Sequence, residues 1–173
     1  MADITIRKAE PQDIESVARV HIQSWRETYP GIMPQAKLDS MNLEASMRNW
    51  QNTLAGDSWF YVAEVEAEFC GFISGGVNRS NEGCSTGLAD SCSAELAAMY
   101  ILAKHHGKGI GRALYSTIAG KAISQGHKSM VAWVAEKNPA CGFYAHMGGE
   151  LVDSRIMMVM GCEVPLVAFR FML

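Results

Sequence analysis

The sequence predicts one domain of the α/β class (α+β by strict class), residues 1–173, in which helices cover both faces of a mixed, mostly antiparallel twisted sheet. Segments with helical periodicity alternate along the chain with short segments rich in β-branched and aromatic residues. The β-rich segments around residues 59–74 and 151–172 each indicate a hairpin, and no linker or internal repeat interrupts the pattern. A chain of 173 residues can bury a full hydrophobic core without disulfides or metals.

The first third of the chain predicts a strand and two helices. Residues 4–7 alternate apolar and polar side chains, as a short strand does. After Pro11, apolar residues fall on one face of a helix that reaches about Trp25, and the Tyr-Pro-Gly sequence at 29–31 ends it. A second helix is predicted over residues 43–54, where apolar residues recur at intervals of four, three and four.

Six strands and two helices are predicted in the rest of the chain. In order, they are strands at 59–65 and 69–74, a polar loop at 78–93, a strand at 94–101, a helix closed by Gly126, a strand at 130–134, a short helix at 139–146, and strands at 151–160 and 164–172. Residues 130–134 are almost entirely apolar, as expected of a strand covered on both faces. The loop at 78–93 is long, and loops of that length are uncommon unless they are mobile or functional.

Composition limits the classes of partner and the compartment. The formal net charge of −3 argues against a nucleic-acid partner, because phosphate binding needs a strongly basic face. The N-terminal segment does not resemble a signal peptide, and no run of about 18 apolar residues is present that could span a membrane. The cysteines are odd in number and form no CxxC pair, which indicates reduced thiols in a cytoplasmic protein. They are Cys70, Cys84, Cys92, Cys141 and Cys162.

A glycine-rich turn between the strand at 94–101 and the following helix is the most informative motif. Glycines at 107, 109 and 111 allow a tight turn whose N–H groups converge on one point at a helix N-terminus. Such a turn binds anions, and pyrophosphate is the expected occupant. The chain has no GxxxxGK[ST] sequence, which excludes a Walker loop, and the turn lies mid-chain after a hairpin, which argues against a dinucleotide-binding fingerprint.

The segment His106-Gly107-Lys108-Gly109-Ile110-Gly111 resembles the [QR]xxGx[GA] motif of the GNAT superfamily of acyl-CoA N-acyltransferases, with His106 in place of Gln or Arg. Residues 138–149 are similar to that family's N-P-[AS]-x-x-F-Y-x-x-x-G-[FG] segment, and residues 21–32 are similar to its first helix and loop. The resemblance therefore covers essentially the whole chain in the right order. It implies a GNAT-like fold and the transfer of an acetyl group from acetyl-CoA to a primary amine of a small molecule or peptide, by direct attack in a ternary complex.

The resemblance also implies where acetyl-CoA binds. In the family, the pantetheine arm pairs with the strand before the glycine turn like an added β-strand, which places backbone contacts at Met99, Tyr100 and Ile101. Asn138 is expected to contact the same cosubstrate. The pyrophosphate is expected to lie against the turn formed by His106, Gly107, Lys108, Gly109, Ile110, Gly111 and Arg112.

Two residues are candidates for proton transfer. An ammonium acceptor must lose a proton before it attacks the thioester, and Glu95 is placed to accept it; a salt-bridged glutamate at a strand end is the equal alternative. Glu27 is a weaker rival. Tyr144 matches the family's tyrosine that protonates the departing thiolate, against the alternative of a tyrosine packed on the sheet. A backbone N–H near Tyr100 or Ile101 would stabilise the oxyanion.

The remaining candidates are assigned structural roles or are left open. Trp25 and Trp50 lie on apolar helix faces and are expected in the core, while Tyr29 could line an acceptor pocket. Cys141 has no base beside it and is expected to be structural. No metal site is expected, because the histidines lack ligand spacing. An acyl-CoA-binding domain without catalysis and a protein N-terminal acetyltransferase are the alternative functions, and the family resemblance also suggests a homodimer.

Overall fold

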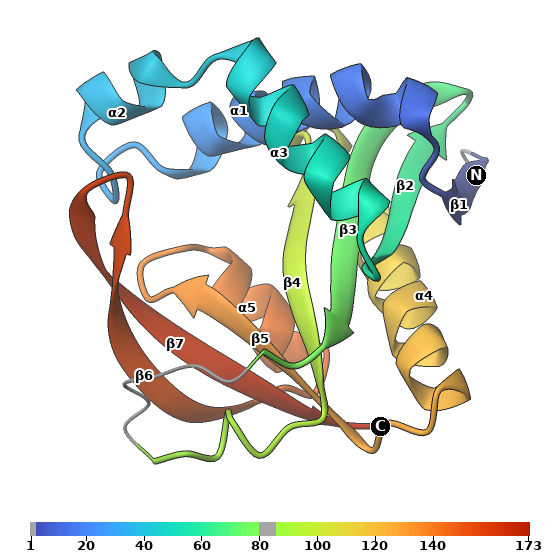
Figure 1. Cartoon of the computed structure of the whole chain (residues 1–173), viewed down its shortest axis with the longest axis vertical. Coiled ribbons are helices and arrows are strands. Elements are labelled where there is room, and N and C mark those ends of the chain that lie inside the picture. The colour runs from blue at the N-terminus through green and yellow to red at the C-terminus, as the bar shows by residue number, and fades with distance from the viewer. Residues whose placement is uncertain (1–2, 80–85) are drawn as a thin grey trace.

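The computed structural model describes residues 3–79 and 86–173. Within these residues the predicted helices and strands are present in the predicted order, together with one short helix that was not predicted (Figure 1). In chain order they are β1 (Ile4–Lys8), the 3-10 turn η1 (Pro11–Asp13), α1 (Ile14–Thr28), α2 (Gln35–Ser40), α3 (Leu43–Ala55), β2 (Trp59–Val65), β3 (Glu68–Val77), β4 (Ala94–Ile101), the 3-10 turn η2 (Ala103–His105), α4 (Ile110–Ser124), β5 (Ser129–Ala135), α5 (Ala140–His146), β6 (Glu150–Val159) and β7 (Cys162–Met172).

The strands form one sheet in the order β1-β2-β3-β4-β5-β7-β6. Among the described strands, β4 and β5 are the one parallel pair, and the other neighbours are antiparallel. The predicted hairpins are β2–β3 and β6–β7, whereas α4 makes the long crossover that a parallel pair requires. The prediction of a mixed, mostly antiparallel sheet is confirmed.

Helices cover both faces of this sheet, as predicted. On one face, Ile110, Leu114 and Ile118 of α4 are buried together with residues of β2–β5 and with Tyr144 of α5. On the other face, α1 and α3 pack against β2 and β3, and Trp50 of α3 meets phenylalanine rings of both strands. These two apolar layers hold the strands at the positions from which the site is built.

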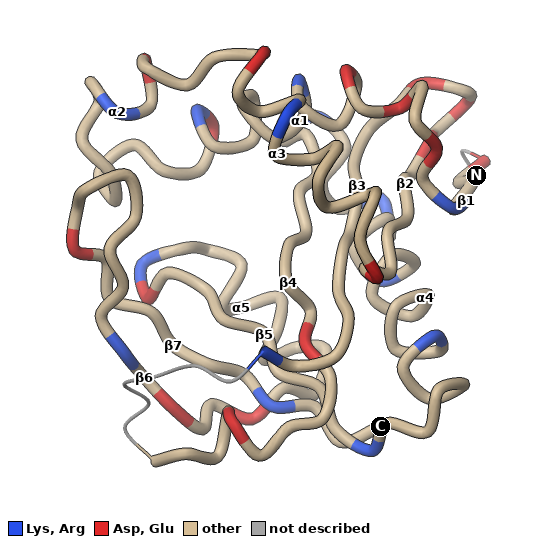
Figure 2. Tube along the Cα trace, in the orientation of Figure 1, with Lys and Arg blue, Asp and Glu red and all other residues tan. Residues whose placement is uncertain are grey.

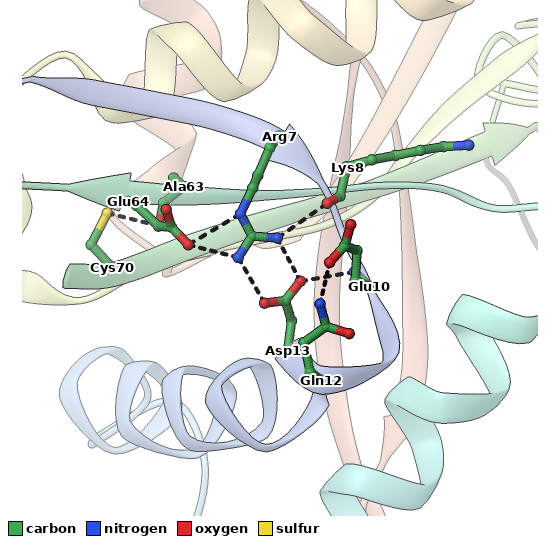
Figure 3. Close-up of polar contacts among 8 residues, drawn as sticks. All are labelled: Arg7, Lys8, Glu10, Gln12, Asp13, Ala63, Glu64 and Cys70. Carbon is green, nitrogen blue, oxygen red and sulfur yellow. Dashed lines mark hydrogen bonds and ion pairs between the residues drawn. The ribbon is translucent and has the colours of Figure 1, made fainter. Parts of the chain in front are cut away.

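An ion-pair network fixes the first strand against the start of α1 (Figure 3). The Arg7 guanidinium donates to both carboxylate oxygens of Asp13 at 2.8 Å and also to Glu64 of β2. Asp13 is 6 % exposed, and its hydrogen bond with Arg7 holds the pKa of this carboxyl below its usual value. The network ties β1, η1 and β2 together where the sheet has its outer edge.

Two features were not predicted from the sequence. Helix α2 (Gln35–Ser40) buries one apolar side chain, Leu38, and six residues are too few to display a helical period. Strand β3 runs to Val77 rather than ending at residue 74, because Gly75 allows β4 to approach closely: a Cβ there would lie 2.5 Å from the Glu95 carbonyl oxygen.

The predicted loop at 78–93 is only partly described, since residues 80–85, Cys84 among them, lie outside the described residues. Residues 86–93 form turns that dock onto β6, where the buried Asp153 accepts hydrogen bonds from the Thr86 N–H and hydroxyl, both at 3.0 Å. No helix among the described residues is long and apolar enough to cross a membrane.

Candidate active site

Strands β4 and β5 pair over three residues and then separate. Ala94, Glu95 and Leu96 are in register with residues 130–132 of β5, and the later residues of β4 have no partner on that side in the described chain (Figure 1). Met99, Tyr100 and Ile101 therefore present an unpaired backbone edge inside the sheet. Such an edge can bind an extended ligand as an added strand.

A β-bulge marks the place where the two strands part. Ser74 of β3 is opposite Ala98 and Gly75 is opposite Leu96, so Ala97 is an extra residue on β4. Bulges bend a strand and re-aim its side chains. Here the bulge puts Met99 and Ile101 on the α4 side of the sheet, and Tyr100 on the side of α1 and α3.

The glycine turn connects the unpaired edge to the N-terminus of α4. Gly107 and Gly109 have φ of +76° and +86°, in the left-handed region that favours glycine, and Gly109 is the N-cap of the helix. No side chain caps this helix and its first turn contains no acidic residue. The first intrahelical bond runs from the Ala113 N–H to the Gly109 carbonyl, so the three preceding N–H groups remain for an anion.

Basic and aromatic side chains complete the turn. Lys108 and Arg112 are exposed beside it, and the Lys108 ammonium lies 3.4 Å from Nδ1 of the buried His105. Gly111 allows α5 to approach, because a Cβ there would lie 3.1 Å from the Phe143 ring. The turn thus combines positive charge, free N–H groups and close contact with the helix that carries Tyr144.

His106, where the sequence departs from the family motif, has a structural role here. Its Nε2 lies 2.9 Å from the Ile101 carbonyl oxygen, so an N–H on the ring donates to the last residue of β4. The histidine therefore links the turn to the end of the unpaired edge.

Three tyrosines from distant parts of the chain, Tyr29, Tyr100 and Tyr144, lie near enough for their phenols to interact electrostatically, and we call them the tyrosine group. Tyr144 of α5 is 5 % exposed and packs among Phe143, Phe169 and Phe171. Burial raises the pKa of Tyr144 well above its ordinary value, and the neighbouring Tyr29 phenol raises it further. The phenol therefore stays protonated throughout the neutral range and can donate a proton.

Tyr100 and Tyr29 are the other two members of this tyrosine group. Burial is the largest cause of the raised pKa of each phenol, and the Tyr29 and Tyr144 phenols raise the pKa of Tyr100 further. Tyr29 stacks on Trp25 with ring centroids 4.2 Å apart. The sequence predicted only backbone contacts for Tyr100; its large aromatic side chain next to the predicted cofactor edge was the available signal.

Asn138 orients α5 rather than pointing freely into the opening. Its side-chain oxygen accepts from the Ala140 N–H at 2.8 Å, and the side chain lies near enough to Tyr29 to lower the pKa of that phenol, against the larger effect of burial. Asn138 thus links the start of the helix that carries Tyr144 to the tyrosine group. Cys141, on the same helix, donates its thiol to the Ala135 carbonyl, and burial raises the pKa of that thiol.

Glu95 lies on the face of the sheet covered by α1 and α3. The residue is 7 % exposed, and its carboxylate pairs with the guanidinium of Arg79. It lines a groove of about 630 Å³ together with Ala97 and Ala98, at the point where β4 leaves β5. No hydrogen bond or ion pair among the described residues joins the Glu95 carboxylate to the tyrosine group. Glu95 and Tyr100 both lie on β4, on either side of the bulge at Ala97.

The rival base Glu27 is already engaged. Its two oxygens accept from the Gln23 amide at 3.0 Å and from the Ala103 N–H at 2.9 Å, which caps η2. Trp50 is buried as expected, while Trp25 is partly buried. His21 packs edge-on against Trp25, Trp50 and Tyr100, and burial lowers its pKa to about 4, so it is neutral at pH 7.

Charged residues in the described chain are dispersed. Figure 2 shows lysine and arginine positions interspersed with aspartate and glutamate positions rather than gathered over one element. The local charge at the glycine turn therefore comes from a few residues placed by the fold.

Comparison with known proteins agrees with this geometry. The profile of the Acetyltransferase (GNAT) family matches residues 19–148. An uncharacterized N-acetyltransferase of Bacillus subtilis (strain 168), YuaI, is 34 % identical over 150 residues, which are 86 % of this chain and 82 % of that protein.

Two solved structures share the fold. The GCN5-related N-acetyltransferase from Rhodopseudomonas palustris superposes with a TM-score of 0.78 at 14 % identity, over 100 % of this chain and 98 % of the other. PaiA N-acetyltransferase from Thermoplasma acidophilum, solved in complex with coenzyme A, gives 0.72 at 20 % identity over 99 % of each chain. The fold is therefore the one seen in these solved N-acetyltransferases. The chain belongs to the GNAT family of acetyltransferases.

Proposed function

We propose that this chain transfers an acetyl group from acetyl-CoA to a primary amine of a small molecule or peptide within a ternary complex. The observation that carries the proposal is the unpaired edge of β4, which leads directly into the uncapped N-terminus of α4. An edge of free peptide groups suits a pantetheine arm, and the adjacent turn suits a pyrophosphate. PaiA from Thermoplasma acidophilum, with the same fold, binds coenzyme A.

The residues proposed to hold acetyl-CoA fall into two groups. Met99, Tyr100 and Ile101 offer backbone groups to the pantetheine arm, and the segment from His106 to Arg112 surrounds the pyrophosphate with N–H groups and positive charge. Asn138 is the remaining residue proposed for acetyl-CoA. It fixes the start of α5, the helix that carries Tyr144, and its side chain lies near Tyr29. Acetyl-CoA supplies a thioester whose carbonyl carbon the amine can attack.

The proton transfers are assigned to two side chains on opposite sides of β4. Glu95 accepts the proton that the ammonium acceptor must lose, and the new N–C bond forms as the C–S bond breaks. Tyr144 donates its proton to the leaving thiolate and takes up the second proton that the acylated nitrogen must lose to become an amide; the buried phenol is protonated at neutral pH, as a proton donor must be. The alternative is an acyl-CoA-binding module without catalysis, in which Glu95 serves only its ion pair with Arg79 and Tyr144 serves only packing.

Location and assembly are inferred from the cysteines and from the edge of the sheet. The four described cysteines are free, which fits a reducing, cytoplasmic compartment. The edge strand β6 exposes a run of apolar side chains, Ile156, Met157 and Met158 among them, which supports the expectation of a homodimer through the C-terminal strands.

Calorimetry with acetyl-CoA and a thiol-release assay with a panel of amines test the proposal. Wild-type protein and the Tyr144→Phe variant should both bind acetyl-CoA, whereas only the wild type should release thiol at an appreciable rate, with a loss of roughly 10²-fold or more in the variant. The Tyr61→Phe variant, altered on β2, is the matched control and should retain turnover. A wild-type protein that binds no acyl-CoA would refute the proposal.

A further inference from the structure

The groove beside Glu95 carries information about the acceptor. Its lining comes from the C-terminal half of α3, the start of β2, the end of β3 and the bulge of β4. Because Ala97 and Ala98 form part of its wall, the groove opens at the point where β4 and β5 separate. A second hollow of about 520 Å³, between α1 and Phe69, contains neither Glu95 nor Tyr144.

The charges of the groove favour a cation. Asp57 and Glu95 contribute two carboxylates and Arg79 contributes one guanidinium, so the formal charge of the lining residues that the structure describes is −1. The last turn of α3 contains no basic residue and ends at Gly56, so the negative end of the helix dipole also faces this region. An ammonium group suits this groove better than an acidic acceptor does.

Arg79 occupies the place of that ammonium when no acceptor is bound. Its side chain is 76 % exposed, although the Glu95 carboxylate that it pairs with is buried. The exposed guanidinium can leave into solvent, and an ammonium that takes its place keeps the buried carboxylate paired.

Hydroxyl and amide side chains line much of the groove, and Ser74 is one of them. The indole N–H of Trp50, a residue that is 6 % exposed and also lines the groove, is buried and has no hydrogen-bond partner among the described residues. Buried polar groups are nearly always hydrogen-bonded, so an unpartnered N–H in a groove lined by hydroxyls and amides points to a ligand with oxygen atoms.

The strand register places Ser74 and Glu95 on the same face of the sheet. Ser74 and Gly76 are two residues apart on β3, and their partners on β4 are Ala98 and Glu95. Residues two apart on a strand share a face and lie roughly 7 Å apart along it. A six-membered ring that carries an amine and hydroxyl groups can bridge these positions through hydrogen bonds at both ends.

We propose that this groove binds the acceptor and that the acceptor is a hydroxylated primary amine of the amino-sugar class. The inference rests on the proposed function and adds the substrate class. The amine displaces Arg79 from Glu95, and the ring hydroxyls bind Ser74 and the amide side chains of Asn49 and Asn52 at the end of α3. On transfer, the ammonium gives one proton to Glu95, the neutral nitrogen bonds to the acetyl carbon and the C–S bond breaks; the departing thiolate takes the proton of Tyr144, and the second proton of the nitrogen restores the Tyr144 phenol.

Thiol release at saturating acetyl-CoA tests the substrate class. The amines are D-glucosamine, cyclohexylamine as the same-sized ring without hydroxyls, putrescine, glycine and an alanine-led peptide. We expect kcat/KM for glucosamine to exceed that for cyclohexylamine by at least about tenfold, because a site that binds hydroxyls rejects analogues that lack them. A preference for cyclohexylamine, putrescine, glycine or the peptide would overturn the inference.

Two single substitutions test whether Ser74 in the groove recognises the hydroxyl groups of the acceptor. The Ser74→Ala variant should raise KM for glucosamine roughly tenfold and leave the constants for cyclohexylamine nearly unchanged. Ser16→Ala, in the second hollow, is the matched control and should change neither. Equal effects of Ser74→Ala on both amines, with the melting temperature unchanged, would refute the role of Ser74. If acetyl-CoA binds but no amine in the panel releases thiol, the proposed function itself fails.

Discussion

Replacing Gly109 by alanine isolates the contribution of the glycine turn. Gly109 has φ of +86° and caps α4, and no atom lies within 4 Å of the position that a Cβ would take. The expected penalty is therefore conformational rather than steric, about 1–2 kcal/mol for an L-residue in the left-handed region. The chain can relieve this strain by rotating the turn, which would turn N–H groups away from the pyrophosphate.

The loss of binding follows from the contacts that such a rotation would remove. A hydrogen bond from a backbone N–H to a charged phosphate contributes about 1.5–3 kcal/mol, so the loss of one raises the dissociation constant for coenzyme A by roughly 10- to 100-fold. Pantetheine lacks the pyrophosphate, and its affinity should change little. Calorimetry with both ligands measures the two effects separately.

Gly120 provides the control, because it lies in the same helix, with ordinary helical φ and no atom within 4 Å of the place where a Cβ would stand. Gly120→Ala should raise the free energy of unfolding by about 0.5–1 kcal/mol without changing the affinity for coenzyme A. If Gly109→Ala lowers the melting temperature but leaves the dissociation constant for coenzyme A unchanged, the turn does not hold the pyrophosphate and the reasoning fails.

Three further predictions concern pH and ion pairs. Burial lowers the pKa of His21 from 6.5 to about 4, so the free energy of unfolding should decrease by up to about 3 kcal/mol as the pH falls from 6.5 to 4. Denaturant titrations at several pH values should show this decrease, and a His21→Leu variant should lack it. Arg79→Ala frees Glu95 and should lower KM for the acceptor amine severalfold in the thiol-release assay; an increase would contradict the displacement of Arg79 by substrate. The hydrogen bond with Arg7 lowers the pKa of Asp13, so the stability that this pair contributes is present above about pH 4 and is lost on further acidification. Asp13→Asn should therefore flatten that acid limb of the unfolding curve, and an unchanged limb would assign the acid sensitivity elsewhere.

Most of the fold could be predicted because its elements have strong local patterns. The helices α1, α3 and α4 each bury one apolar face, and the strands of both hairpins are rich in β-formers. Helix α2 was missed because Leu38 is its one buried side chain. The extension of β3 to Val77 depends on contact with β4, which the local sequence does not encode.

The site was only partly accessible from the sequence. The glycine turn is a local motif, and the structure places it at a helix N-terminus next to an unpaired strand edge, as expected. The meeting of Tyr29, Tyr100 and Tyr144 depends on three segments that only the tertiary fold brings together. The same holds for the pairing of Glu95 with Arg79. The catalytic and cofactor-binding roles of these residues stay predictions for the experiments above.

The separation of β4 from β5 affects how stable and how abundant the folded protein is in the cell. An open backbone edge normally invites pairing with other chains, but here it lies between two neighbouring strands, where another protein has poor access. A ligand that occupies this edge completes the hydrogen-bond ladder and binds only the folded state. At a free concentration one hundred times its dissociation constant, acetyl-CoA would add about 2.7 kcal/mol to the free energy of unfolding. The abundance of the folded enzyme would then rise and fall with the supply of its own cosubstrate, which couples protein turnover to acetyl metabolism without any separate sensor.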